Sequence, residues 1–346
     1  MSFLASLTNT QNGANDNFGT FQLRGQNVFE IARENSPLPS GSGQLGGEFL
    51  SVNNSDKHVF SAGGIAVVSP DETVVVLQSG QSAPDGNGIL DEIRGIAIND
   101  SNDIGAVVRL SMTAGGGADD FGIYLLSDNT VQEIVREGEP SPDGNGLLAN
   151  ILHPPVMNNA SQFALNISLT DTDEGSRDNQ GIFLADATGI QRIVRNGDVV
   201  PDGNGVFANF FPVTTVAGLA EFGINDSGHI AFQAQVDTAG DGIGDLDGLY
   251  LWDGDRIITV AQTDEPLLGS KIESFSFDGE RGFNDQSQLA FSFQLENGDS
   301  GVALFTPVPE PATITLVLCC FLLLPGMTNR HFRPSSFPLL PFFGKF

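Results

Sequence analysis

The fold is decided by one stretch, Gly181-Ile-Phe-Leu-Ala-Asp-Ala-Thr-Gly-Ile-Gln-Arg-Ile-Val-Arg195-Asn-Gly-Asp-Val-Val-Pro-Asp-Gly-Asn-Gly205, because close copies of it recur along the chain. It begins with a short run of apolar residues, continues through a short turn, and returns in a run in which apolar and polar residues alternate. This pattern is typical of a β-hairpin. The closing Pro-Asp-Gly-Asn-Gly segment combines a fixed φ with residues that accept positive φ. We predict that this segment is a structural connector rather than a ligand loop.

The repeats share a glycine that is followed fourteen residues later by Arg or Gln. The five full copies run from Gly19 to Arg33, Gly64 to Gln78, Gly122 to Arg136, Gly181 to Arg195 and Gly248 to Gln262. A sixth copy, Gly301 to Phe305, contains the first half only. The Pro-Asp-Gly-Asn-Gly segment also occurs at residues 84–88 and 142–146. The sequence therefore predicts one hairpin that is repeated along residues 19–305.

An asparagine-led turn precedes each later hairpin. The five asparagines are Asn53, Asn99, Asn158, Asn225 and Asn284, and they stand 46, 59, 67 and 59 residues apart. A strand on each side of this turn and the two strands of the hairpin give four strands per unit, which is typical of propeller blades. We predict an all-β fold of tandem four-stranded antiparallel repeats. The favoured form is a five-bladed β-propeller with one blade completed from both ends of the chain, and the runner-up is a truncated larger propeller.

Around the fourth of these asparagines the sequence resembles the tandem-repeat family named for its N-x-x-G-x-x-A-F motif. The full motif stands at Asn225, Gly228, Ala231 and Phe232. In the next copy, Asn284, Ala290 and Phe291 match, with Ser287 in the glycine position. The resemblance implies an exported bacterial protein with an exchangeable C-terminal anchor, and it implies no particular chemistry.

Successive connections in an antiparallel meander alternate between the two ends of the strands. We therefore expect the asparagine turns and the hairpin turns on one face, and the Pro-Asp-Gly-Asn-Gly loops with the variable connections on the other. These variable connections are acidic at residues 118–120, 171–178 and 237–247.

The most acidic connection contains Asp237, Asp241, Asp245 and Asp247. Closely spaced carboxylates separated by glycine can bind a hard cation through oxygen, so these four aspartates are the candidate calcium ligands. A solvated acidic loop that keeps the surface soluble is the alternative interpretation. No motif in the sequence identifies a catalytic residue or another cofactor.

The composition restricts the partners and the class of protein. There are 43 Asp and Glu residues against 15 Lys and Arg, which gives a formal net charge of −28. This charge repels phosphate backbones and disfavours nucleic acid as a partner. The hydrophobic fraction of 40% is sufficient for a folded core in residues 1–306.

The composition changes after Thr306, and we assign residues 307–346 to a separate sorting tail. Val308-Pro-Glu-Pro-Ala-Thr313 is followed by an apolar run and then by Arg330 and Arg333. This order resembles the PEP-CTERM sorting signal, with the match carried by Pro309, Glu310 and Pro311. The resemblance implies processing by an exosortase-type membrane enzyme. The 16 residues from Ala312 to Met327 predict a short apolar helix that anchors the chain in the membrane only transiently.

Export also requires an N-terminal signal, and the first residues do not resemble one. We expect the natural start to lie upstream of Met1. The sequence as a whole predicts an exported cell-surface or matrix protein that acts as a non-catalytic binding or structural module. The alternative is an enzyme that acts on extracellular polysaccharide through its acidic loops, and a third possibility is a purely architectural coat.

Overall fold

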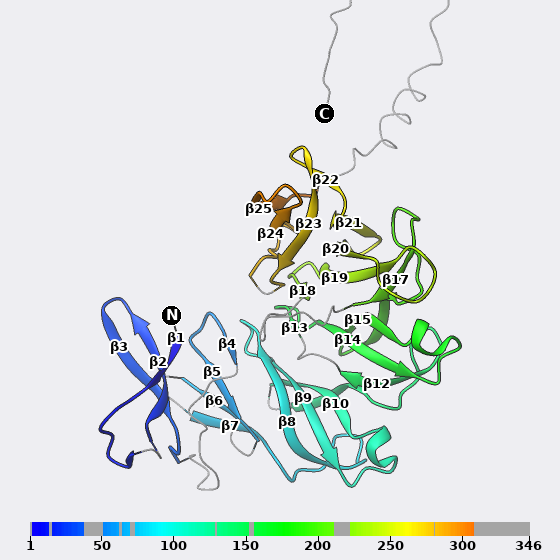
Figure 1. The fold of residues 1–346 in the computed structure, drawn as a ribbon. Coiled ribbons are helices and arrows are strands. Elements are labelled where there is room, and N and C mark those ends of the chain that lie inside the picture. The colour runs from blue at the N-terminus through cyan, green and yellow to red at the C-terminus, as the bar shows by residue number, and fades with distance from the viewer. Residues whose placement is uncertain are drawn as a thin grey trace, which may run out of the picture. The chain divides into compact units, whose positions relative to one another are not determined.

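The computed structural model describes residues 2–13, 16–37, 51–61, 64–69, 73–128, 130–151, 156–210, 222–279 and 281–307. Residues 1–306 form one compact unit, which is all-β, with antiparallel pairing throughout the sheets that follow. Figure 1 shows each sheet as a consecutive block of colour, from blue for the first to orange for the last. Each sheet is therefore built from a continuous part of the chain.

The first three sheets occupy the N-terminal 136 residues. The first contains β1 (Ser2–Ser6), β2 (Phe18–Arg24) and β3 (Asn27–Arg33). The second contains β4 (Ser51–Val52), β5 (His58–Ser61), β6 (Gly64–Val68) and β7 (Thr73–Gln78). The third contains β8 (Ile89–Ile98), β9 (Ile104–Ser111), β10 (Phe121–Ser127) and β11 (Thr130–Arg136).

The last three sheets follow the same strand order. The fourth contains β12 (Leu147–Ile151), β13 (Val156–Met157), β14 (Phe163–Thr170), β15 (Gln180–Asp186) and β16 (Gly189–Arg195). The fifth contains β17 (Val206–Asn209), β18 (Phe222–Ile224), β19 (Ile230–Asp237), β20 (Leu246–Trp252) and β21 (Ile257–Gln262). The sixth contains β22 (Pro266–Leu267), β23 (Ser270–Phe277), β24 (Leu289–Leu295) and β25 (Ser300–Phe305).

The fourteen-residue offset is a cross-strand pair. Gly122 lies opposite Arg136, Gly181 opposite Arg195 and Gly248 opposite Gln262, and the first two hairpins pair in the same register. Each of these five hairpins has a register shift one residue after the glycine, which indicates a β-bulge. The predicted hairpins and their register are confirmed.

The recurring glycine has a packing reason. A Cβ on Gly181 would lie 2.8 Å from the carbonyl oxygen of Val194 and 3.1 Å from the ring of Phe183. An aromatic ring two residues later covers the glycine in the same way in the third hairpin, where Tyr124 covers Gly122. Only glycine leaves room for this close approach of ring and backbone.

The number of sheets differs from the prediction. Among the described residues there are six sheets rather than five, and the strands of the first and sixth sheets do not pair with each other. The predicted blade shared by both ends of the chain is therefore absent from this part of the structure. Counting the repeats did not predict the sixth sheet. The first hairpin forms a sheet with β1, and the incomplete last repeat forms a separate sheet from β22 to β25.

Five hydrophobic clusters each join two successive sheets. Phe60 and Ala32 join the first two sheets, Val59 and Leu90 the second and third, and similar clusters continue to the sixth. In the sixth sheet, however, alternate side chains of β24 and β25 are exposed, including Val302 at 78%. The core of this unit therefore lies between the sheets.

Asparagine side chains join the sheets at the turns that separate the first and second strands of a unit. The Asn158 side chain is 4% exposed, and its Oδ1 accepts hydrogen bonds from the backbone N–H groups of Ala160 and Gln162 at 3.0 and 2.9 Å. Its Nδ2 donates to the carbonyl oxygen of Asn225 in the next sheet at 2.9 Å. One side chain thus closes its own turn and binds the neighbouring turn.

The same joint occurs between every pair of sheets from the second to the sixth, and we call it the asparagine ladder. The donor-to-carbonyl distances are 2.9 Å for Asn53 to Asn99, 3.2 Å for Asn99 to Asn158, 2.9 Å for Asn158 to Asn225 and 3.1 Å for Asn225 to Asn284. A second, exposed row lies beside it, in which the backbone N–H of Asn159 donates to Asp226 and that of Asp226 to Asp285. The face that carries these turns is the turn face, and the opposite one is the loop face.

Candidate functional site on the loop face

The Pro-Asp-Gly-Asn-Gly loops contact the variable connections between the second and third strands of the same sheet. In the fourth sheet, Nδ2 of Asn145 donates to Asp178 at 2.9 Å, and in the third sheet Nδ2 of Asn87 donates to Asp119 at 2.8 Å. The prediction that these two kinds of loop share a face is confirmed.

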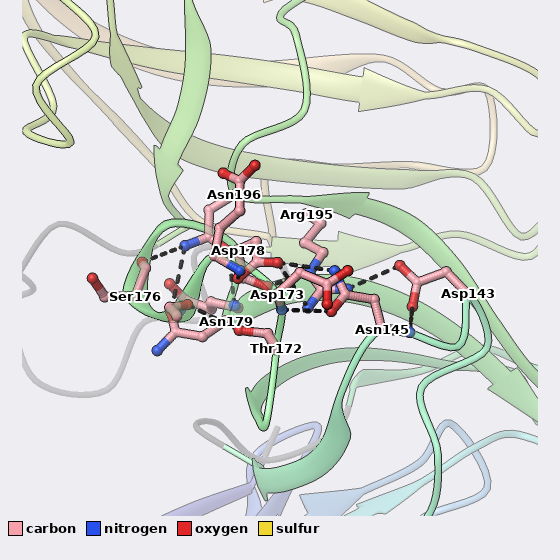
Figure 2. Close-up of polar contacts among 12 residues, drawn as sticks. Asp143, Asn145, Thr172, Asp173, Ser176, Asp178, Asn179, Arg195 and Asn196 are labelled. Atoms are coloured by element: carbon pink, nitrogen blue, oxygen red, sulfur yellow. Dashed lines mark hydrogen bonds and ion pairs between the residues drawn. The ribbon is translucent and has the colours of Figure 1, made fainter.

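Figure 2 shows the cluster of the fourth sheet. The Asn145 side chain bridges the two loops, because its Oδ1 also accepts a hydrogen bond from the backbone N–H of Asp173 at 2.9 Å. Asp178 is 6% exposed, and its Oδ1 accepts from the backbone N–H of Glu174 at 3.2 Å. Both polar side chains therefore hold backbone groups of the loops in place.

Arg195 lies beneath these loops at the end of β16 and is 2% exposed. Its Nε donates to the carbonyl oxygen of Asp178, and its Nη1 lies 3.0 Å from Oδ2 of Asp143. The remaining nitrogen, Nη2, is 3.8 Å from Oδ2 of Asp178. One guanidinium thus ties the Pro-Asp-Gly-Asn-Gly loop to the variable connection, and we call this arrangement the arginine clamp.

The third sheet contains a second arginine clamp. Arg136 is 4% exposed, its Nε donates to the carbonyl oxygen of Asp119 at 2.7 Å, and its Nη1 lies 3.4 Å from Oδ2 of Asp85. Its Nη2 donates to the carbonyl oxygen of Asn87 at 2.8 Å, and its Nη1 also donates to the hydroxyl oxygen of Tyr124 at 3.3 Å. The same fourteen-residue offset therefore places a buried cation under the same loop in two successive sheets.

Two carboxylates of the clamps, those of Asp178 and Asp119, are held in the charged form. Burial alone would raise the pKa of Asp178, but hydrogen bonds from Thr172, Asn145 and the Glu174 backbone, together with the charge of Arg195, hold this pKa below its usual value. The equivalent Asp119 has a lowered pKa for the same reasons. Asp178 and Asp119 therefore remain ionised beside the guanidinium groups.

One position differs chemically between the two clusters. In the fourth sheet, Oδ1 of Asn196 accepts from the backbone N–H of Gln180 at 2.8 Å, and its Nδ2 lies 3.5 Å from Oδ1 of Asn179. The third sheet has Glu137 and Asp120 in these two places. Burial first, and then the charge of Asp120, raises the pKa of Glu137 to about 7. The carboxyl groups of Glu137 and Asp120 in the third sheet thus stand where the fourth sheet has two asparagine amides.

The four predicted calcium ligands all lie in or beside the connection between β19 and β20, but they face different partners. Asp237 accepts from the backbone N–H groups of Gly240 and Gly242 at 2.6 Å each. Asp245 accepts from the backbone and hydroxyl of Thr238 at 2.8 and 2.7 Å. Each of these carboxylates thus closes a turn of its own loop.

The other two ligands are used locally as well. Oδ1 of Asp241 accepts from the backbone N–H of Ile243 at 3.0 Å, and Oδ1 of Asp247 lies 3.4 Å from Nε2 of Gln235. Within the part of the chain that the structure describes, no three His, Cys, Asp or Glu side chains gather as a metal site. A cation at this loop would have to compete with the N–H donors, and calcium binding stays a prediction.

The sorting motif Pro309, Glu310 and Pro311 lies outside the described residues, as does the predicted apolar helix. In the ranges that are described, no helix has the length and apolar character needed to cross a bilayer.

Sequence reasoning missed two groups of residues. Arg136 and Arg195 were noted only as the ends of the repeats, and the five asparagines only as turn formers. The signal was present in both cases, because a charged or amide side chain recurred at a fixed offset from a buried strand. Its partner could not be found, since the carbonyl oxygen bound by Asn158 belongs to a residue 67 positions away.

The chain belongs to a protein family of unknown function, DUF7453, whose family model matches residues 1–315. No curated protein matches the sequence. The family match covers all six sheets, and it assigns no chemistry to the loop face.

Proposed function

We propose that this protein is an exported cell-surface or matrix β-repeat protein whose loop face acts as a non-catalytic binding or structural module. The observation that carries the proposal is the use of the polar side chains on this face. Asp178, Asn145 and Arg195 each bind loop backbone or one another, and the third sheet repeats this arrangement with Asp119, Asn87 and Arg136. Such a network fixes the shape of a surface, which is what recognition of a partner requires.

We further propose that the sheets are the blades of a propeller. Antiparallel sheets with hydrophobic clusters between successive members, and a ladder of hydrogen bonds from each sheet to the next, support this architecture. Six sheets in the described residues support a blade number larger than the five predicted from the repeats.

The resemblance to the N-x-x-G-x-x-A-F repeats and to the PEP-CTERM signal supports export, transient membrane anchoring and processing by an exosortase-type enzyme. The net charge of −28 is compatible with a soluble surface outside the cell. The test is expression from the natural gene, with its upstream sequence in the same frame, in a bacterium that carries an exosortase-type enzyme. We expect the protein at the cell surface, and we expect Pro309→Ala and Glu310→Ala variants to stay in the inner membrane unprocessed. Wild-type protein found only in the cytoplasm would contradict the proposal.

Binding and turnover are separated by a second experiment on the full-length protein. We expect binding on an array of extracellular glycans and basic peptides, with no release of reducing ends from the glycans that bind. A protein that binds nothing on such arrays would support a purely architectural coat instead.

The second candidate function is an enzyme acting on extracellular polysaccharide. The specific observation in its favour is Glu137, a buried carboxyl beside Asp120 whose pKa of about 7 suits a general acid. Release of reducing ends that is lost in Glu137→Gln and kept in Glu296→Gln would favour this function over the module.

A further inference from the structure

The third Pro-Asp-Gly-Asn-Gly loop has no arginine beneath it. In the fifth sheet, Gln262 stands opposite Gly248, in the place that Arg195 and Arg136 occupy in the two preceding sheets. The Gln262 side chain is 7% exposed, so it lies inside the sheet as the arginines do. The Gln262 amide forms no hydrogen bond to another described residue. It therefore does not replace the bonds that the guanidinium groups of Arg195 and Arg136 make to the loops.

One acidic group that an arginine would bind, the loop aspartate, is still present. Asp202 takes the place of Asp143 and Asp85 in the loop. Glu265 takes the place of Asp198 and Glu139, which accept the backbone N–H groups of Arg195 and Arg136 rather than their guanidinium groups. Both Asp202 and Glu265 are exposed. The fifth sheet therefore keeps the loop carboxylate and lacks the guanidinium that this carboxylate binds in the other two sheets.

The loop itself is arranged differently where the arginine is missing. Asn87 and Asn145 reach across to the neighbouring connection, whereas Nδ2 of Asn204 turns back onto Asp202 of its own loop at 3.0 Å. The backbone N–H of Asn204 also donates to Asp202 at 3.0 Å. Among the residues that the structure describes, Asp202 is thus bound only by its own turn, and its carboxylate is exposed.

A buried hydroxyl group points to the missing ligand. Tyr250 is 0% exposed, and its hydroxyl has no hydrogen-bond partner among the described residues. In the third sheet the equivalent hydroxyl, that of Tyr124, accepts from Arg136 at 3.3 Å and donates to Glu133 at 2.9 Å. Burial and then the charges of Asp202 and Glu265 raise the pKa of Tyr250. A buried hydroxyl without a partner is costly, and a donor from outside would remove that cost.

We propose that the fifth sheet is a binding site for an arginine side chain of another polypeptide, with the guanidinium taking the place that Arg136 and Arg195 hold in the other two clamps. The Asp202 carboxylate binds its charge, and the Tyr250 hydroxyl accepts one of its N–H groups. Arginine fits better than lysine because one planar group binds separate acceptors in each filled clamp. Arg136 donates to Asp119, Asp85 and Asn87, and Arg195 donates to Asp178 and Asp143. The inference names a partner for the proposed binding module and rests on that proposal.

The chain offers an internal control, since it contains two tyrosines, Tyr124 in a filled clamp and Tyr250 in the open one. The full-length protein is labelled with [ζ-13C]tyrosine and titrated with the peptide acetyl-Gly-Arg-Gly-amide. We expect the Cζ resonance of Tyr250 to shift and that of Tyr124 to stay in place. The same peptide with citrulline, which is uncharged and has nearly the same shape, should shift the Tyr250 resonance at least tenfold less at equal concentration.

Two variants complete the test. Asp202→Asn should weaken arginine binding at least tenfold, and Gln262→Arg should abolish it because the new side chain fills the site from within. The Tyr124 resonance reports whether each variant is folded. A Tyr250 shift that is equal for the arginine and citrulline peptides, or that persists in Gln262→Arg, would overturn the proposal. That result would leave the glycan-array test of the module unaffected.

Discussion

On the turn face, Asn158 reaches out of its sheet to a backbone carbonyl of the next one, whereas on the loop face Arg195 stays within its own sheet and binds two of its loops. The first joint is made by a neutral amide and the second by a buried charge. Both side chains are almost completely buried, at 4% and 2% exposed. The difference teaches that the repeat separates two tasks, because one face holds the sheets together and the other gives each sheet its own loop surface.

The largest effect is expected where a buried charge is removed. In Arg195→Met, the carboxylates of Asp143 and Asp178 lose their partner while Asp178 stays buried, and we expect unfolding free energy to fall by about 3–5 kcal/mol. Chemical denaturation of the full-length protein measures this. The control is Arg281→Met, because the Arg281 side chain is 81% exposed in its pair with Asp278, and it should cost less than about 1 kcal/mol. Equal losses of unfolding free energy in Arg195→Met and Arg281→Met would mean that the arginine clamp does not stabilise the loop face.

The ladder is tested by an isosteric change. Asn158→Asp keeps the oxygen that closes its turn but replaces the Nδ2 donor by an acceptor that faces the carbonyl of Asn225, so we expect a loss of about 2–4 kcal/mol.

Asn284→Asp is the matched control for the ladder. Asn284 closes its turn through Gln286 and Gln288 in the same way, but it is exposed, and its Nδ2 bonds within its own turn. The difference in unfolding free energy between the two variants measures the bond from sheet to sheet. If the two variants lost the same unfolding free energy, the hydrophobic clusters rather than the ladder would hold successive sheets together.

The third prediction concerns pH and compares the third sheet with the fourth. The raised pKa of Glu137 means that the native state holds more protons than the unfolded state between about pH 4.5 and 7. Stability from this group is therefore complete below pH 4.5 and is lost as the pH rises through 7. Glu137→Gln imitates the amide of Asn196 and should stabilise the protein by about 1–3 kcal/mol at pH 8 and by little at pH 4.5.

Thermal unfolding of the wild type and the Glu137→Gln variant at both pH values measures the effect. A stabilisation that is the same at pH 4.5 and pH 8 would show that the carboxyl pair does not titrate in this range. The change Asn196→Gln, which introduces no charge, controls for repacking in the fourth sheet.

The smallest effect is expected in the exposed row beside the ladder. Asp226 accepts two hydrogen bonds from Asn159, both at 2.9 Å, but it is exposed to water. Asp226→Ala should therefore cost only about 0.5–1.5 kcal/mol in unfolding free energy. A loss of unfolding free energy as large as that of Asn158→Asp would mean that the exposed row stabilises the contact between sheets as much as the buried amides do.

Local features of the fold were predictable from the sequence. The glycine and the Arg or Gln fourteen residues later are direct partners across a hairpin, so their offset carried the register. The shared loop face also followed from the alternation of connections, as the bond between Asn145 and Asp178 confirms. These features depend on neighbours within one unit, where the spacing along the chain determines the spacing in space.

Contacts between units were not predictable in the same way. Asn99 showed its turn propensity in the sequence, but nothing near it identified the carbonyl of Asn158 as its partner. The arginine clamp was missed for a related reason. The positive charge of Arg136 and the acceptors on Asp85 and Asn87 lie about fifty residues apart, and only the packed sheet brings them together. The local hydrogen bonds of the predicted calcium ligands were not predictable either, because Asp237 and Asp245 accept from backbone N–H groups of their own loop, and calcium binding there stays a prediction.

The asparagine ladder has a consequence for how such a protein can change in length. Each joint binds a carbonyl oxygen of the peptide backbone, which every amino acid offers, and three of the four joints add a bond to a side chain of the neighbouring turn. A gene segment encoding one whole unit could therefore be duplicated or deleted by recombination, and the new neighbours would still meet through the same bond. Loops on the opposite side would be free to diverge after each such event.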